Sequence, residues 1–250
     1  MKDGFIRVCA ATPDIRVADC QYNEKNIMKL MDEAYAKQIS VLVFPELCIT
    51  GYTCGDLFLQ DVLLSAAQDS LKHIVDHSTG MKMLVFVGMP FVHQGKLYNV
   101  AADGRLLGLV PKKNIPNYSE FYELRHFTPG EDECVDTSLG VKMGSKMLFS
   151  CENVKNLIVA AEICEDVWVA CPPSTQHAQA GATLIVNCSA SDETTGKDIY
   201  RRALISGQSA RLVCGYIYAN AGEGESTQDL VFGGQNLVCE NGNVLAQTKR

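Results

Sequence analysis

The chain has 250 residues, 47% of them hydrophobic, and a formal net charge of −7 at pH 7. This length is sufficient for one large folded domain, and the hydrophobic content is too high for a disordered protein. The lysines and arginines are scattered along an acidic chain, which argues against nucleic acid or an anionic membrane as the main partner.

Neither a basic and then apolar leader nor an apolar run long enough to cross a bilayer is present, so we expect a cytoplasmic protein without a membrane partner. The eleven cysteines are an odd number, several lie inside apolar runs, and no Cys-x-x-Cys pair occurs. Reduced, buried thiols are therefore expected in place of a disulfide scaffold or a zinc ribbon.

Short apolar runs alternate with helical periodicity in the first half of the chain. In order, the patterns predict a strand over 5–11, a helix over 26–37, a strand over 40–44, a helix over 61–77 and a strand over 83–89. In the second helix, Val62, Leu63, Ala66, Ile74 and Val75 are expected to face inward. Segments 97–102 and 106–110, joined by Asp103-Gly104-Arg105, predict a hairpin.

The second half continues this alternation. Strands are predicted over 157–163 and 182–188, a helix over 197–211, a strand over 212–219, and a strand–turn–strand unit over 238–248. These elements indicate an α/β protein with a mixed sheet, either one doubly wound sheet or two sheets packed face to face. Because the chain ends at Arg250 directly after a strand, it is expected to be a piece of a longer polypeptide.

Three reactive side chains each follow an apolar run. Glu46 comes directly after 41–45, Lys112 after 106–111, and Cys164 after 157–163. A sharp turn at Cys164 would lift its sulfur out of the sheet, and a desolvated Glu46 could take the thiol proton. An ammonium at Lys112 would stabilise an oxyanion, although Lys113 is an adjacent competitor. Each residue alone is more often structural, but α/β folds assemble sites at strand ends.

Two weaker patterns favour ordinary structural roles. His73 and His77, four apart on a predicted helix, could share a metal ion, but no acidic neighbour completes a metal motif and surface histidines are favoured. The segment Gly222-Glu-Gly-Glu-Ser226 is rich in glycine but carries two acids that would repel a phosphate. We expect no metal site here, and we expect 222–226 to be a loop near the rim of an active site.

These residues lie in motifs that resemble the nitrilase (carbon–nitrogen hydrolase) superfamily. The motifs are Phe44-Pro-Glu-Leu-Cys-Ile-Thr-Gly-Tyr52, Pro111-Lys-Lys-Asn-Ile-Pro-Asn-Tyr118 and Glu162-Ile-Cys-Glu-Asp-Val-Trp168. Within it, the chain is most similar to the N-terminal glutaminase domain of glutamine-dependent NAD synthetases. Supporting segments are Phe121-Tyr-Glu-Leu-Arg125, Ala190-Ser-Asp-Glu-Thr-Thr-Gly-Lys197 and Tyr218-Ala-Asn-Ala-Gly-Glu-Gly-Glu-Ser226.

The resemblance implies a four-layer αββα sandwich with mixed sheets, in a single carbon–nitrogen hydrolase domain over 1–250. It implies that Glu46 is the general base, Lys112 the oxyanion-stabilising residue and Cys164 the nucleophile, with Glu123 supporting the lysine. The residues that it implies for the glutamine pocket are Tyr52, Tyr118, Phe121, Glu165, Ser191 and Lys197. Lys197 stands where some members have arginine, and a lysine holds a carboxylate without a bidentate fork.

The implied reaction hydrolyses the side-chain amide of L-glutamine through a cysteine thioester and supplies ammonia to a C-terminal synthetase domain. No cofactor is implied here, since ATP and Mg²⁺ would serve only that domain, whose Ser-Gly-Gly-x-Asp-Ser signature is absent from this sequence. A homo-oligomer is also expected. Two alternatives stay open: a free-standing amidase acting on another amide, an N-carbamoyl compound or a nitrile, and a non-catalytic assembly module.

Overall fold

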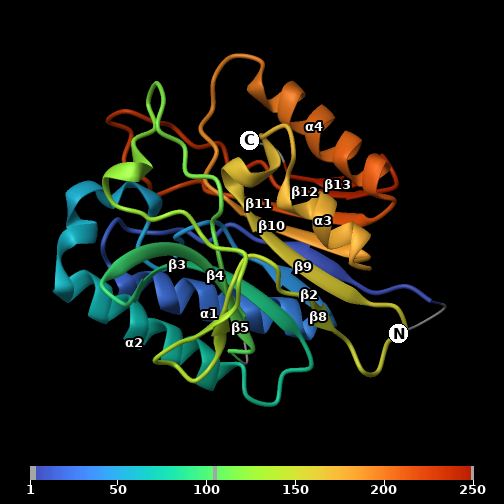
Figure 1. Ribbon diagram of the computed structural model, residues 1–250, viewed down its shortest axis with the longest axis horizontal. Helices are drawn as coiled ribbons and strands as arrows, with labels where there is room; N and C mark the ends of the chain where they lie inside the picture. The colour runs from blue at the N-terminus through green and yellow to red at the C-terminus, as the bar shows by residue number, and fades with distance from the viewer. Residues whose placement is uncertain (1–3, 104–105, 249–250) are drawn as a thin grey trace.

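The computed structural model describes residues 4–103 and 106–248, in which helices cover the outer faces of two sheets (Figure 1). Helices α1 (Cys20–Ala36) and α2 (Asp61–His77) pack on one sheet, and α3 (Pro173–Gln179) and α4 (Lys197–Leu212) pack on the other. This arrangement confirms the predicted four-layer αββα sandwich, and it decides between the two sheet arrangements that periodicity left open.

The first sheet has the strand order β1-β2-β3-β4-β5-β7-β6 among the described residues. Strands β1, β2 and β3 run parallel, whereas β3, β4 and β5 form an antiparallel meander. The bounds are Val8–Ala10 for β1, Val41–Val43 for β2, Leu84–His93 for β3, Lys96–Asp103 for β4, Gly108–Pro111 for β5, Val135–Asp136 for β6 and Lys142–Met143 for β7.

The second sheet has the order β13-β12-β11-β10-β9-β8. Its centre, β9 to β11, is parallel, and the strands at both edges are antiparallel, so this sheet is mixed as well. The bounds are Phe149–Ser150 for β8, Ile158–Ile163 for β9, Leu184–Ser189 for β10, Gly215–Asn220 for β11, Leu237–Glu240 for β12 and Asn243–Gln247 for β13.

Successive side chains of a strand point alternately into the space between the sheets and toward the helices. In β2, Val41 and Val43 face the second sheet, while Leu42 faces the helices α1 and α2. Phe86 of β3 packs edge-on against Phe149 of β8, with ring centroids 5.7 Å apart, across the space between the sheets. Because successive strand side chains point to opposite faces, fully apolar runs bury both faces of each central strand. The Val/Ile/Leu runs therefore predicted these strands correctly.

Most predicted elements are confirmed, with shifts at their ends. Helix α2 has the predicted bounds, and the 97–102 and 106–110 segments pair antiparallel as β4 and β5, although Gly104 and Arg105 of the turn lie outside the described residues. Helix α1 begins six residues before the predicted start, at Cys20, where the Asp19 carboxylate accepts the N–H of Tyr22. The strand predicted from 212 begins at Gly215, because α4 extends through Leu212.

One prediction for the core is wrong. Val62 is 78% exposed, whereas Leu63 is buried. The buried face of α2 is formed by Leu63, Ala67, Leu71 and Ile74, at helical spacings of four, four and three residues. Val62 precedes this face by one residue, which is a rotation of about 100° around the helix axis, and its side chain therefore points to solvent.

The two histidines of α2 join it to α1. His73 Nδ1 lies 3.1 Å from Glu24 Oε2, and His77 Nε2 lies 2.8 Å from Asp32 Oδ1. Among the described residues no group of three or more His, Cys, Asp or Glu side chains could hold a metal ion. The eleven cysteines, which all lie in the described ranges, are free thiols. In residues 4–103 and 106–248, no helix is long and apolar enough to span a membrane.

Candidate active site

Glu46 is placed between the two sheets by a close approach of backbones. It follows β2 and Pro45, and its segment passes directly over Gly88 of β3, where an added Cβ would lie 2.3 Å from the nitrogen of Leu47. Only glycine permits this approach. The Glu46 side chain is fully buried, and its Oε2 accepts the N–H of Ala190 at 2.9 Å. The carboxylate therefore contacts the chain just after β10 of the second sheet.

Lys112 lies between two carboxylates. It follows β5 and is fully buried, and its Nζ donates to Glu46 Oε1 at 2.7 Å and to Glu123 at 2.7 and 2.9 Å. Burial alone would lower the pKa of Lys112, but Glu123 and Glu46 together raise that pKa well above its ordinary value. The ammonium is therefore charged. Lys113 turns away and pairs with Asp132 at the surface.

Glu123 is the second carboxylate on this ammonium. Burial raises the pKa of Glu123 above its ordinary value, Lys112 opposes the rise, and the nearby charge of Glu46 adds to it. The Tyr52 hydroxyl donates to Glu123 Oε1 at 2.8 Å. One ammonium faces two carboxylates, so the three groups together carry no net positive charge, and Lys112 can stabilise a thiolate only in part.

Cys164 occupies the turn that its sequence position predicts. It is the first residue of η3 (Cys164–Val167), directly after β9, and its φ of 43° lies in the left-handed region. Its N–H donates to Asn187 Oδ1 at 3.0 Å. Burial and the negative charge of Glu46 raise the pKa of the Cys164 thiol well above its ordinary value, while Lys112 lowers it in part. The resting sulfur is therefore a neutral thiol that needs a base.

The acids beside Cys164 are held by other groups. Glu162 accepts the Tyr216 hydroxyl and the N–H of Ser174, and Asp166 accepts the N–H of Ile163 at 3.0 Å. Both carboxylates are buried. These two acids are thus hydrogen-bonded structural anchors around the turn.

A cavity of about 410 Å³ opens beside Cys164. Cys164 lines it, and so do five of the six residues that the resemblance implies for substrate binding: Tyr118, Phe121, Glu165, Ser191 and Lys197. The Tyr118 hydroxyl donates to Glu165 at 3.0 Å. The sixth residue, Tyr52, lines a neighbouring cavity instead, together with Glu123.

Lys197 and Ser191 are positioned by their surroundings. The Lys197 ammonium pairs with the buried Asp192 and lies 5.7 and 5.6 Å from the ring centroids of Phe121 and Trp168. The hydroxyl of Ser191 accepts a hydrogen bond from Arg201, which is itself fully buried. The cavity thus carries a cation over aromatic faces at one wall and the carboxylate of Glu165 at another.

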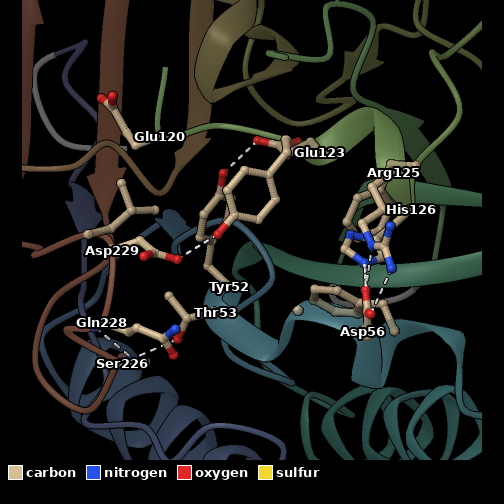
Figure 2. A pocket seen from close by; sticks show the side chains of 15 residues that line it. Tyr52, Thr53, Asp56, Glu120, Glu123, Arg125, His126, Ser226, Gln228 and Asp229 are labelled. Atoms are coloured by element: carbon tan, nitrogen blue, oxygen red, sulfur yellow. Dashed lines mark hydrogen bonds and ion pairs between the residues drawn. The ribbon is translucent and has the colours of Figure 1, made fainter. Parts of the chain in front are cut away.

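The neighbouring cavity, also about 410 Å³, is shown in Figure 2. Tyr52 and Glu123 form part of its wall, so their hydroxyl–carboxylate bond lies between this space and Lys112. Away from them, Asp56 accepts bonds from Arg125 and His126, and Arg125 and His126 hold the pKa of Asp56 well below its usual range.

Several residues that position this site were not predicted. Asn99 Nδ2 donates to Glu46 Oε1 at 2.5 Å, and Asn187 anchors the backbone of Cys164. Arg201 holds the 191–193 segment through Ser191, the carbonyl of Asp192 and Glu193. The two asparagines did give a sequence signal, because each interrupts an apolar run within its strand. A buried amide there must find partners.

Comparison with known proteins gives the family. The family model of the carbon–nitrogen hydrolases matches residues 6–250. The glutamine-dependent NAD(+) synthetase of Mycobacterium tuberculosis strain H37Rv is 39% identical over 253 residues, which is 99% of this chain and 37% of that protein. The chain thus spans less than half the length of this curated relative.

Solved structures agree with the fold. The crystal structure of a glutamine-dependent NAD(+) synthetase from Cytophaga hutchinsonii has a TM-score of 0.87 and 31% identity, covering 98% of this chain and 40% of that one. An amidase from Nesterenkonia sp. has a TM-score of 0.76 at 19% identity, covering 100% of this chain and 88% of the amidase. The latter likeness concerns the fold alone. With the family model matched over nearly its whole length, this chain belongs to the carbon–nitrogen hydrolase family.

Proposed function

We propose that the chain is a glutaminase, which hydrolyses the side-chain amide of L-glutamine and supplies ammonia for NAD synthesis by a synthetase domain. The observation that carries the proposal is the cavity in which Cys164 lies with Glu165 and Lys197. Free glutamine is a zwitterion, so a carboxylate and an ammonium in one cavity match its α-amino and α-carboxylate groups. The names of the relatives support the same substrate.

In the first half-reaction, Glu46 takes the proton of the Cys164 thiol as the sulfur attacks the amide carbon. The tetrahedral oxyanion is stabilised by the Lys112 ammonium and by a backbone N–H. Because the N–H of Cys164 is bound to Asn187, this second donor belongs to another residue. Glu46 returns the proton to the leaving nitrogen, ammonia departs, and a glutamyl thioester remains on the sulfur.

In the second half-reaction, Glu46 deprotonates a water molecule, which attacks the thioester carbonyl. Collapse of this adduct breaks the C–S bond, glutamate leaves, and the thiolate recovers its proton from Glu46. Lys112 stays charged throughout, since its pKa lies far above neutrality. The Glu46 carboxylate is held on Asn99, Lys112 and Ala190, so one oxygen can exchange protons while the group keeps its position.

The test is glutamate release from L-glutamine by the purified 250-residue chain, beside Cys164→Ala and, as a matched control, Cys171→Ala. Cys171 is exposed and lies seven residues further on. We expect turnover by the wild type and by Cys171→Ala, and none by Cys164→Ala. If a longer protein that includes the synthetase part also releases no glutamate, but aliphatic amides, N-carbamoyl compounds or nitriles are hydrolysed, the glutaminase proposal is wrong and the amidase alternative replaces it.

A further inference from the structure

The connection between β11 and β12 is tied to the start of η1 (Tyr52–Leu59) by a carboxylate. Glu225 Oε1 accepts the N–H of Tyr52 at 2.7 Å, and Glu225 Oε2 accepts the N–H and the hydroxyl of Thr53 at 3.0 and 2.5 Å. Ser226 N–H donates back to Thr53 Oγ1 at 2.9 Å. The first N–H groups of a helix have no partner within it, so this carboxylate satisfies them.

The backbone before Glu225 is shaped for this contact. Gly224 has a φ of 100°, and an added Cβ there would lie 1.8 Å from the carbonyl oxygen of Ile15. Only glycine can therefore let the chain pass Ile15 and turn Glu225 inward. The glycine-rich segment 222–226, which the sequence predicts to be a loop near the rim of an active site, holds the start of η1 through Glu225.

Tyr52 is consequently held at three points. Glu225 fixes its backbone, and Phe232 of the same connection packs edge-on against its ring with centroids 5.8 Å apart. Its hydroxyl donates to Glu123 Oε1, and Glu123 in turn accepts Lys112 Nζ. An unbroken series of contacts thus runs from Glu225 to the ammonium of the triad, and Figure 2 shows the Tyr52–Glu123 bond within it.

The same connection contacts the two segments that carry the substrate cavity. Asp229 accepts the Tyr122 hydroxyl at 2.6 Å, next to Glu123 in the chain. The carbonyl of Val231 accepts the N–H of Glu193 at 2.7 Å, between Ser191 and Lys197. Glu225 itself is absent from the lining of that cavity. Glu225 can therefore affect a bound substrate only indirectly.

We propose that Glu225 is a positioning residue for amide hydrolysis, which acts through Tyr52 to fix the Glu123 carboxylate and thereby the Lys112 ammonium. This inference rests on the proposed glutaminase activity for its substrate. A displaced ammonium stabilises the oxyanion less but leaves the α-groups of glutamine bound. Loss of the Glu225 contacts with Tyr52 and Thr53 therefore lowers kcat and leaves KM nearly unchanged.

The experiment compares Glu225→Gln with Glu223→Gln, whose exposed side chain lies two residues earlier in the same segment. Glu225→Gln replaces one of the two accepting carboxylate oxygens with an NH2 group, which is a donor and would face the backbone N–H of Tyr52 or Thr53. We expect its kcat for glutamine to fall by about tenfold, with KM within about twofold, and Glu223→Gln to match the wild type. A Glu225→Gln variant with unchanged kcat overturns the proposal.

A double-mutant cycle tests the route of the effect. Tyr52→Phe removes only the hydroxyl that reaches Glu123. If Glu225 acts through Tyr52, then Glu225→Gln has little further effect on kcat in the Tyr52→Phe background. Two falls that multiply independently contradict this route. Should Glu225→Gln fail to fold, Thr53→Val can replace it in the cycle. This variant removes the hydroxyl that donates to Glu225 and accepts the Ser226 N–H, but it keeps both backbone N–H bonds to the carboxylate, so a smaller fall is expected.

A second measurement tests the positioning role of Glu225 independently of the proposed glutamine substrate. Mass spectrometry of the Cys164 peptide gives the rate at which iodoacetamide alkylates this thiol. The rate measures the reactivity of Cys164 without any turnover of glutamine. We expect slower alkylation in Glu225→Gln than in Glu223→Gln. If glutamine is not hydrolysed but this difference persists, the glutaminase proposal fails and the positioning role stands. Equal alkylation rates with a lowered Tm in Glu225→Gln would show a purely structural role and overturn it.

Discussion

Asn187 Oδ1 accepts the backbone N–H of Cys164 at 3.0 Å, while Asn187 Nδ2 donates to the Tyr216 hydroxyl at 3.2 Å. Both ends of one fully buried amide are thus engaged, and the orientation of that amide follows. Cys164 has a left-handed backbone, which costs a residue with a side chain on the order of 1 kcal/mol or more. Asn187 offsets this cost by holding the turn from the neighbouring strand β10.

Replacing Asn187 with leucine should misplace Cys164, the proposed nucleophile. The variant keeps the side-chain volume but leaves the Cys164 N–H without its acceptor, so we expect kcat for glutamine to fall by about ten- to a hundredfold. Tyr216→Phe removes the partner of the other amide end and the hydroxyl that donates to Glu162, but it leaves the Cys164 N–H bonded, so it should give a smaller fall. Steady-state kinetics of both variants measure this order. A Tyr216→Phe variant slower than Asn187→Leu would contradict the assigned roles.

Replacement of the adjacent residues Lys112 and Lys113 by methionine should have very different effects. Lys112→Met leaves the buried carboxylates of Glu46 and Glu123 without their shared cation. We expect loss of activity by a factor of at least about 10³, and destabilisation by about 3 kcal/mol. Lys113→Met removes only a half-exposed pair with Asp132, so we expect unchanged kcat and a loss of at most about 1 kcal/mol. Urea unfolding and glutaminase assays of the pair measure both effects. Equal stability losses would argue against the buried ion cluster.

The fold could be predicted well where the burial of an element leaves a recognisable pattern of apolar residues in the sequence. Leu42 and its neighbours Val41 and Val43 are apolar because both faces of β2 are covered, and the run itself indicates a central strand. The start of α1 could not be predicted, because its first turns bury polar groups. Asn23 is fully buried, and its amide donates to the carbonyl oxygens of Arg16 and Ile49. Such a contact leaves no apolar pattern.

The site was predictable in part for a related reason. Glu46, Lys112 and Cys164 each follow a recognisable strand, so their places at strand ends can be read from the chain. Asn99 and Asn187 contact them from other strands, across 53 and 23 residues of sequence. No spacing rule connects such pairs, since the contacts arise only when the strands assemble into sheets. The hydrogen bond from the Tyr52 N–H to Glu225 joins residues 173 apart in the sequence and could not be predicted for the same reason.

Lys197 should affect binding more than chemistry. Its ammonium lies in the cavity wall over Phe121 and Trp168, away from the groups that hold Lys112. In Lys197→Met we expect KM for glutamine to rise by about ten- to a hundredfold, with kcat within about threefold. Lys197→Arg keeps the charge and should stay close to the wild type. Butyramide, which lacks both α-groups, serves as a control substrate whose hydrolysis should not respond. A fall in kcat with constant KM would contradict the binding role.

Glu162 should make the fold less stable as the pH rises. Burial raises the pKa of Glu162 from 4.5 to about 7, although the Tyr216 hydroxyl and the Ser174 N–H oppose the rise. The folded state therefore binds this proton more tightly than the unfolded state does. The resulting stabilisation is complete below about pH 4.5 and is lost as the pH rises to about 7, where the difference reaches roughly 3 kcal/mol.

Glu162→Gln should remove this dependence, because its amide can still accept from Ser174 and face Tyr216 without ionising. We expect the free energy of unfolding of the variant, relative to the wild type, to increase by up to about 3 kcal/mol between about pH 5 and pH 8. Urea unfolding at several pH values measures the difference, in which the titrations of all other groups cancel. A difference that is constant over this range would mean that Glu162 keeps one charge state throughout. The Tyr216 and Ser174 donors would then outweigh burial.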